Sequence, residues 1–203
     1  MDKKAHWENI FQTKDTTIVS WYQAVPATSI NLIQKTGLSA NSAIIEIGSG
    51  DSFLVDHLIE KGYTDISLLD ISENALETIR KRLGEKSNSV TFVATDINNF
   101  STDKRFNIWH DRAVFHFLTE KKDIENYVKI ATKSVIRKGF LIIGTFSDKG
   151  PDSCSGLTIE KYSESKLTAA FSAGFSKLEC FTENHNTPSG GIQNFLFCIF
   201  QRK

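Results

Sequence analysis

The sequence predicts an α/β protein with a doubly wound, mixed sheet, and two observations support this class. Apolar runs of strand length alternate with segments whose apolar residues repeat at the helical period. That alternation is typical of repeated βα units, in which helices cover both faces of a mostly parallel sheet. The last two strand-like runs instead flank the turn-rich residues 186–191, which favours an antiparallel hairpin. We therefore expect parallel strands followed by an antiparallel one.

Seven runs are predicted to be strands. They cover residues 43–47, 66–70, 90–95, 106–110, 139–146, 175–183 and 192–201. The part of the last run at residues 195–200 is apolar without alternation, which is typical of a strand covered on both faces. We therefore place that strand inside the sheet and not at its edge.

Helical periods occupy the connections between strands. The expected crossover helices cover residues 53–61, 74–83 and 120–135. Gly62 and Gly84 directly follow the first two, as glycine commonly does at helix ends, and Ser72 is suited to cap the second. Before the first strand, two shorter helices are expected at residues 7–11 and 27–36.

The same pattern predicts the domain organisation. No internal repeat or long linker divides the 203 residues, so we expect one domain that spans residues 1–203. Residues 41–203 are predicted to form its α/β core. Residues 1–40 are predicted to form a helical lid, whose polar connector carries Trp21 and Tyr22.

Composition argues against several partners. Lys plus Arg and Asp plus Glu both number 24, so no net field attracts the chain to nucleic acid. No apolar run approaches the roughly 18 residues of a membrane span, and the polar N-terminus does not resemble a signal peptide. Cys154, Cys180 and Cys198 are odd in number and far apart. We therefore expect free thiols, no metal site and a reducing, cytoplasmic location.

The most informative stretch is a glycine turn between an apolar strand and a helix. It reads Ile44-Ile45-Glu46-Ile47-Gly48-Ser49-Gly50-Asp51. Glycines let the backbone approach a ligand closely at the carboxyl ends of strands. A dinucleotide-binding turn would have Gly or Ala where Phe53 stands, which disfavours NAD and FAD. Glu46 would repel a pyrophosphate but suits a ligand with ammonium and sulfonium groups, such as S-adenosylmethionine (SAM).

Two further acids follow the next two strands. Asp70 ends the second predicted strand, at the spacing from the glycines where an acid accepts both hydroxyls of a ribose. Asp96 follows the third strand and would accept the amino group of an adenine. Each acid alone is a weak signal, because acids at strand ends commonly cap helices. The ordered occurrence of Glu46, Asp70 and Asp96 at three strand ends is much less expected by chance.

These residues carry a family resemblance. Glu46-x-Gly48-x-Gly50, Asp70 and Asp96 together resemble the ordered motifs of the class I (Rossmann-like) SAM-dependent methyltransferases, over roughly residues 40–203. The resemblance implies SAM as cofactor, a strand order of 3-2-1-4-5-7-6 and a last strand that runs antiparallel. The residues that we assign to the cofactor are Glu46, Gly48, Ser49, Gly50, Asp70, Ile71, Asp96, Ile97 and His110.

The segment after the fourth predicted strand contains the candidates for catalysis. Residues 109–119 (WHDRAVFHFLT) and 150–157 resemble a bacterial subgroup of the family that is described only as generic methyltransferases. His110 or His116 is placed to remove a proton from the acceptor; alternatively, His110 lines the cofactor pocket or caps the next helix. Methyl transfer mainly requires alignment and exclusion of water, so a base is optional.

Acceptor-binding residues are expected at the same edge of the sheet. They are Trp21, Tyr22, Arg112, Phe115 and Cys154. The aromatic side chains, together with that of Phe117, would supply an apolar wall, with core packing as the alternative. Arg112 would clamp a carboxylate of the acceptor, or else form a structural ion pair with Asp111 and nearby acids. Cys154 would touch substrate or be a bystander thiol.

The predicted function is SAM-dependent methyl transfer to an oxygen, sulfur or nitrogen atom of a small molecule. The zero net charge and the absence of an Asn/Asp-Pro-Pro-Tyr-like motif after the fourth strand disfavour nucleic acid as acceptor. Two alternatives stay open. One is a protein lysine methyltransferase, which an open acidic groove would favour. The other is a module that binds SAM or a nucleotide without turnover.

Overall fold

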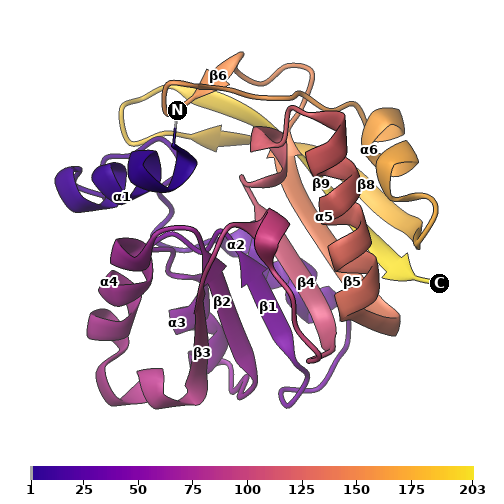
Figure 1. Cartoon of the computed structure of the whole chain (residues 1–203), viewed down its shortest axis with the longest axis horizontal. Helices are drawn as coiled ribbons and strands as arrows, with labels where there is room; N and C mark the ends of the chain where they lie inside the picture. The colour runs from indigo at the N-terminus through magenta and orange to yellow at the C-terminus, as the bar shows by residue number, and fades with distance from the viewer. Residues whose placement is uncertain (1) are drawn as a thin grey trace.

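The computed structural model describes residues 2–203, and its framework is a seven-stranded sheet with the order β3-β2-β1-β4-β5-β9-β8 (Figure 1). The strands are β1 (Ile44–Ile47), β2 (Ile66–Asp70), β3 (Val90–Ala94), β4 (Phe106–Arg112), β5 (Val135–Phe146), β8 (Phe175–Asn186) and β9 (Ile192–Arg202). Neighbours from β3 to β5 pair in parallel, whereas β9 runs antiparallel to both β5 and β8. The order and the antiparallel last strand confirm the predicted fold class.

Helices cover both faces of this sheet. They are α1 (Lys3–Thr13), α2 (Ala27–Lys35), α3 (Leu54–Glu60), α4 (Glu73–Leu83), α5 (Lys121–Ser134) and α6 (Glu164–Phe171). One apolar core includes residues of α2, α3 and α4, and the other includes residues of α5 and α6. Two cores form because successive strand residues point to opposite faces, so Ile44 packs in the first core and Ile45 in the second.

Shorter elements complete the chain. They are β6 (Ser153–Cys154), which pairs with β7 (Leu157–Thr158), and the 3-10 turns η1 (Gly84–Ser89), η2 (Ile97–Asn99) and η3 (Phe115–Phe117). Helix α1 lies beside α4 at one end of the sheet (Figure 1). Within residues 2–203, no helix has the length and apolarity that crossing a membrane requires.

Strand β4 directs two sets of side chains to opposite faces. Trp109 and Asp111 point toward α5, where the Trp109 indole donates to the Tyr127 hydroxyl at 2.9 Å and that hydroxyl donates to Asp111 at 2.6 Å. His110 and Arg112 therefore point to the other face, because side chains alternate along a strand. This alternation separates a structural network from the groups that face the site.

The prediction of three free thiols is wrong. Cys180 of β8 and Cys198 of β9 form a disulfide, because the hairpin register places them directly opposite each other. A bulge between Lys177 and Glu179 shifts that register, and no sequence pattern indicates where a bulge falls. Cys154 is free and buried. The cysteines therefore do not support a reducing compartment.

Candidate active site

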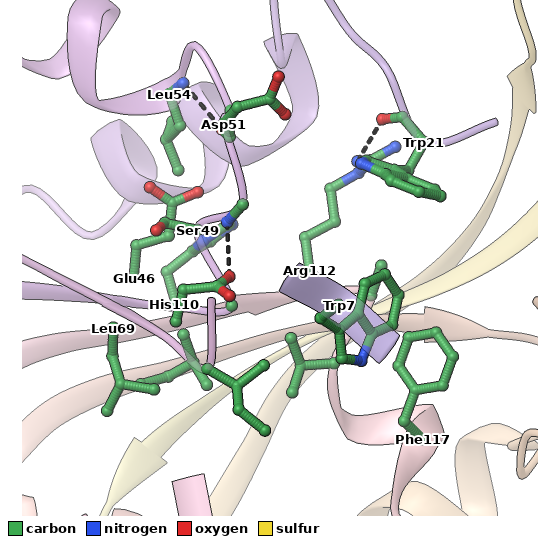
Figure 2. Close-up of a pocket in the computed structure, with 18 of the residues that line it drawn as sticks. Trp7, Trp21, Glu46, Ser49, Asp51, Leu54, Leu69, His110, Arg112 and Phe117 are labelled. Carbon is green, nitrogen blue, oxygen red and sulfur yellow. Dashed lines mark hydrogen bonds between the residues drawn. The ribbon is translucent and has the colours of Figure 1, made fainter. Parts of the chain in front are cut away.

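A cavity lies at the carboxyl ends of β1, β2 and β4, and most of the predicted site residues line it (Figure 2). Those in its lining are Trp21, Tyr22, Glu46, Gly48, Ser49, Gly50, Asp70, Ile71, Asp96, Ile97, His110, Arg112 and Cys154. They come together because parallel strands end at one edge of the sheet. The opposite wall consists of α1 and the connector, residues 14–26.

The turn after β1 requires its glycines. Gly48 has φ +61°, and a Cβ atom there would lie 1.9 Å from Cγ2 of Val114. Gly50 has φ +52°, and its N–H donates to Asp70 Oδ2 at 2.7 Å. Both glycines line the cavity, and the space that a Cβ atom would take is occupied by Val114 at Gly48 and bordered by the Phe11 ring at Gly50.

Two acids border the cavity, one at the end of β2 and one shortly after β3. Asp70 is buried, and its carboxylate accepts the N–H groups of Gly50 and Ser72 at 2.7 and 2.8 Å. Burial raises the pKa of Asp70 to about 6, although these two hydrogen bonds lower it. Asp96 accepts the N–H of Asn98 at 2.8 Å. A carboxylate has roughly four acceptor positions. Both acids therefore keep free positions for hydroxyl or amino donors.

Glu46 is a buried acid with an unsatisfied oxygen. The side chain belongs to β1, and Oε2 has no hydrogen-bond partner among residues 2–203. Burial raises the pKa of Glu46 to about 8; the Ser52 hydroxyl lowers it, and the charge of Asp70 raises it. A buried acid with one unsatisfied oxygen beside a cavity fits a cationic group on a ligand.

The two candidate histidines differ in position. His110 lines the cavity, and neither of its ring nitrogens has a partner in the described part of the chain. His116 lies outside the lining and stacks on Phe146, with ring centroids 4.3 Å apart. Burial lowers the pKa of both histidines to about 3, and the charge of Arg112 lowers it further. Both are neutral and weakly basic, and His116 does not reach the cavity.

Phe115 packs in the core and does not line the cavity, contrary to our expectation. Its ring centroid lies 4.9 Å from that of Tyr127, 5.1 Å from that of Tyr162 and 5.1 Å from that of Phe171. The 3-10 turn η3 directs Phe115 toward α5 and α6 and brings Phe117 into the cavity lining instead. Strand or helix periodicity does not describe such a turn, so the sequence did not distinguish the two phenylalanines.

Four side chains form an aromatic wall of the cavity: Trp7, Phe11, Trp21 and Phe117. The ring of Trp7 lies 6.0 Å from Trp21 and 5.2 Å from Phe117, and Phe11 lies 6.4 Å from Trp21. Trp7 and Phe11 are absent from the predicted site. Their spacing of four residues places them on one face of α1, and this spacing was the available signal.

Polar contacts hold the N-terminal segment against the core. The Glu8 carboxylate of α1 accepts the Ser72 hydroxyl and the Glu73 N–H, each at 2.8 Å, at the start of α4. His185 of β8 forms a hydrogen bond through Nε2 to the carbonyl oxygen of Ser20 at 2.8 Å. No sequence pattern indicates these contacts, because the partners are 64 and 165 residues apart.

Arg112 and Cys154 complete the predicted lining. Arg112 Nη1 donates to the Trp21 carbonyl oxygen at 3.0 Å, and its guanidinium carbon lies 5.1 Å from the centre of the Phe195 ring. Burial raises the pKa of the Cys154 thiol, so this group is neutral at pH 7. Cys154 is therefore not an activated nucleophile.

The fold and the cavity place the chain in a known family. Residues 38–193 match the family described as a methyltransferase domain. The strand order, with its antiparallel last strand, is the order that the resemblance implied. The chain therefore belongs to the class I SAM-dependent methyltransferases, whose methyl donor is SAM.

Its relatives act on different acceptors. The chain is 26% identical over 123 residues to the mouse eEF1A lysine and N-terminal methyltransferase, covering 59% of this chain and 17% of that protein. It is 27% identical over 110 residues to malonyl-[acyl-carrier protein] O-methyltransferase 2 of Ilyobacter polytropus, covering 54% of this chain and 40% of that protein. The chain thus matches less than half of the length of either relative.

A solved structure shows the same fold over nearly the whole chain. It is the N-methyltransferase NodS of Bradyrhizobium japonicum in complex with S-adenosyl-L-homocysteine (SAH). The TM-score is 0.71, the identity is 16%, and the match covers 97% of this chain and 98% of that one. At this identity the similarity is evidence for the fold and does not indicate which acceptor this chain uses.

Proposed function

We propose that this chain is an enzyme that transfers the methyl group of SAM to an oxygen, sulfur or nitrogen atom of a small molecule. One observation carries the proposal: a single cavity joins the acids and glycines suited to SAM with the aromatic wall (Figure 2). Helix α1 and the connector border this cavity opposite the strand ends. A cavity bordered on two sides in this way can hold two reactants in alignment, which methyl transfer requires.

The residues at the ends of β1 to β3 fit SAM. We assign the adenine to Asp96 and Ile97, the ribose to Asp70 and Ile71, and the ammonium group to Glu46. The unsatisfied oxygen of Glu46 and the free acceptor positions of the two aspartates support this assignment. When bound, SAM supplies a methyl group that its sulfonium has already activated.

At the acceptor end of the cavity, the side chains position the acceptor and do not remove a proton from it. A pKa of about 3 makes His110 a poor base at neutral pH, and burial keeps the Cys154 thiol protonated. We therefore propose that the acceptor atom presents a free lone pair at neutral pH. In this assignment His110 contributes a hydrogen bond to the cofactor or the acceptor.

A second candidate function is methylation of lysine on a protein. The match to the mouse eEF1A lysine and N-terminal methyltransferase favours it. The charge of Arg112 argues against it, because this residue lines the part of the cavity that we assign to the acceptor and would repel a protonated lysine. The small-molecule acceptor therefore remains the leading proposal.

One experiment separates these functions. Calorimetry on the purified chain is expected to show saturable binding of SAM and SAH and no binding of NAD. Transfer of labelled methyl groups from SAM is then measured on the small-molecule filtrate and the protein retentate of one bacterial extract. Label in the filtrate supports the proposal, and label on lysines of the retentate supports the second candidate. SAM binding without labelling in either fraction indicates a binding module. NAD binding, or no binding of SAM, overturns the proposal.

SAM binding at pH 7 is expected to release close to one proton from Glu46. The pKa of about 8 keeps Glu46 mostly neutral in the free protein, whereas an adjacent ammonium group favours the carboxylate. The affinity for SAM should therefore rise between about pH 6 and about pH 8, by up to about tenfold per pH unit. Calorimetry in buffers with different ionisation enthalpies measures the release. Glu46→Gln should abolish this proton release, whereas Glu85→Gln, a change at an exposed residue, should not. Equal release by the unchanged chain and both variants would show that Glu46 is not the source of the proton.

A further inference from the structure

The guanidinium of Arg112 has unused hydrogen-bonding capacity. Nη1 donates to the Trp21 carbonyl oxygen, but Nε and Nη2 are buried and have no partner in the described part of the chain. Burial lowers the pKa of Arg112 to about 10, so the group still carries its charge at pH 7. Leaving two charged donors buried without acceptors is unfavourable, which points to a ligand group that accepts from them.

No carboxylate of residues 2–203 pairs with Arg112. The ion pairs of the described chain involve other cations, and Arg82, for example, is paired with Asp56. Glu183 and Glu46 are close enough to raise the pKa of Arg112, but neither forms a hydrogen bond or an ion pair with it among residues 2–203. Asp111 points to the opposite face of β4, toward Tyr127. The alternative of a structural ion pair is therefore not realised.

The two free nitrogens define the shape of the missing acceptor. Nε and Nη2 lie on one edge of the planar guanidinium, and their N–H groups point the same way. That edge matches the two oxygens of a carboxylate, which accept a pair of parallel hydrogen bonds from it. A single carbonyl or hydroxyl oxygen would satisfy only one of the two donors.

The position of Arg112 indicates which molecule carries the carboxylate. Its guanidinium is fixed by Trp21 of the connector and lies against Phe195 of β9. Figure 2 shows the Arg112 side chain extending toward Trp21, on the same side of the view as Trp7 and Phe117, with Glu46 on the other side; all five residues line the cavity. Glu46 is assigned to the amino-acid part of SAM. We therefore infer that Arg112 borders the part of the cavity that SAM leaves free for the acceptor.

We propose that Arg112 binds a carboxylate of the methyl acceptor, with the apolar or aromatic body of that acid against Trp7, Trp21 and Phe117. This inference rests on the proposed function, since it requires a bound methyl donor beside the acceptor. It restricts the acceptor to organic acids with an apolar body. Lysine side chains and neutral aromatic compounds are then poor ligands.

Paired acids and amides test the proposal on the SAH complex of the whole chain. The probes are benzoate with benzamide, phenylacetate with phenylacetamide, and indole-3-acetate with its amide. Quenching of tryptophan fluorescence reports binding, because Trp7 and Trp21 line the cavity. For at least one pair, the acid should bind about tenfold or more tightly than the amide. Arg112→Gln should reduce that difference to about twofold, and Arg105→Gln, which removes an exposed charge, should preserve it.

The affinity of the variants for SAH separates the ways in which the proposal can fail. Arg112→Gln should bind SAH within about threefold of the unchanged chain, since the acceptor and not the donor is lost. An SAH affinity that falls about tenfold would assign the carboxylate to the methionine part of the donor and overturn the proposal. Equal binding of every acid and its amide would also overturn it. If the unchanged chain does not bind SAH, the proposed function itself fails.

Discussion

Replacing Gly48 by alanine is expected to lower the free energy of unfolding by about 3 kcal/mol. For a chain of this size that corresponds to a fall of roughly 10 °C in the melting temperature. Two effects add: Gly48 has φ +61°, and the new Cβ would lie 1.9 Å from Cγ2 of Val114. Urea and thermal denaturation of the two proteins measure the loss.

Two further variants separate the backbone effect from the steric one. Gly37 has φ +68° and no atom within 4 Å of an added Cβ, so Gly37→Ala carries the backbone effect alone, about 1 kcal/mol. Val114→Ala removes the clashing methyl group, so adding Gly48→Ala to it should be no more destabilising than Gly37→Ala. If Gly48→Ala in the unchanged chain destabilises only as much as Gly37→Ala, the close contact with Val114 is wrong.

Part of the site around Gly48 could be predicted from the sequence, but its contact with Val114 could not. Glycine turns after apolar strands predict a close backbone approach, and parallel strands end at one edge, so Glu46, Asp70 and Asp96 could be placed together in advance. The sequence does not reveal that the close neighbour of Gly48 is a protein side chain, because Val114 lies 66 positions further along the chain. Packing against Val114 therefore requires a glycine at position 48.

Alternation of side chains along β4 explains why the predicted site residues His110 and Arg112 both line the cavity. It also gave evidence, which was not used, against an ion pair between Asp111 and Arg112. It places His110 and Arg112 on the face opposite Trp109, and the cavity lining contains both. The same alternation puts Asp111 on the other face, which already argued against a pair between Asp111 and its neighbour Arg112. Beyond the strand end, periodicity stops being informative, and the prediction there placed Phe115 in the cavity.

Long-range contacts are the part that sequence reasoning could not supply. Glu8 caps α4 only because α1 packs over the end of the sheet, and the local sequence does not predict where α1 packs. The disulfide between Cys180 and Cys198 depends on a bulge in β8, which changes which residues face each other. Both features arise from tertiary packing, whereas the predicted elements arise from local periodicity.

Replacing Asp70 by alanine is expected to weaken SAH binding by about 100-fold or more. Its carboxylate holds the turn by accepting the N–H groups of Gly50 and Ser72, and its remaining acceptor positions are assigned to the two ribose hydroxyls. Loss of two hydrogen bonds to a charged group accounts for the expected effect. Calorimetry with SAH measures it, and the melting temperature without ligand shows whether the variant is folded.

Asp70→Asn and the pH dependence of binding distinguish the carboxylate from a purely structural role. The asparagine keeps one acceptor oxygen, so its loss of SAH affinity should lie between those of the unchanged chain and the alanine variant. Because burial raises the pKa of Asp70 to about 6, the carboxyl gains a proton as the pH falls below that value and loses acceptor positions. Affinity should therefore decline more steeply below about pH 6 in the unchanged chain than in Asp70→Asn. A folded Asp70→Ala protein that binds SAH within about threefold of the unchanged chain would mean that Asp70 only holds the glycine turn and that the ribose lies elsewhere.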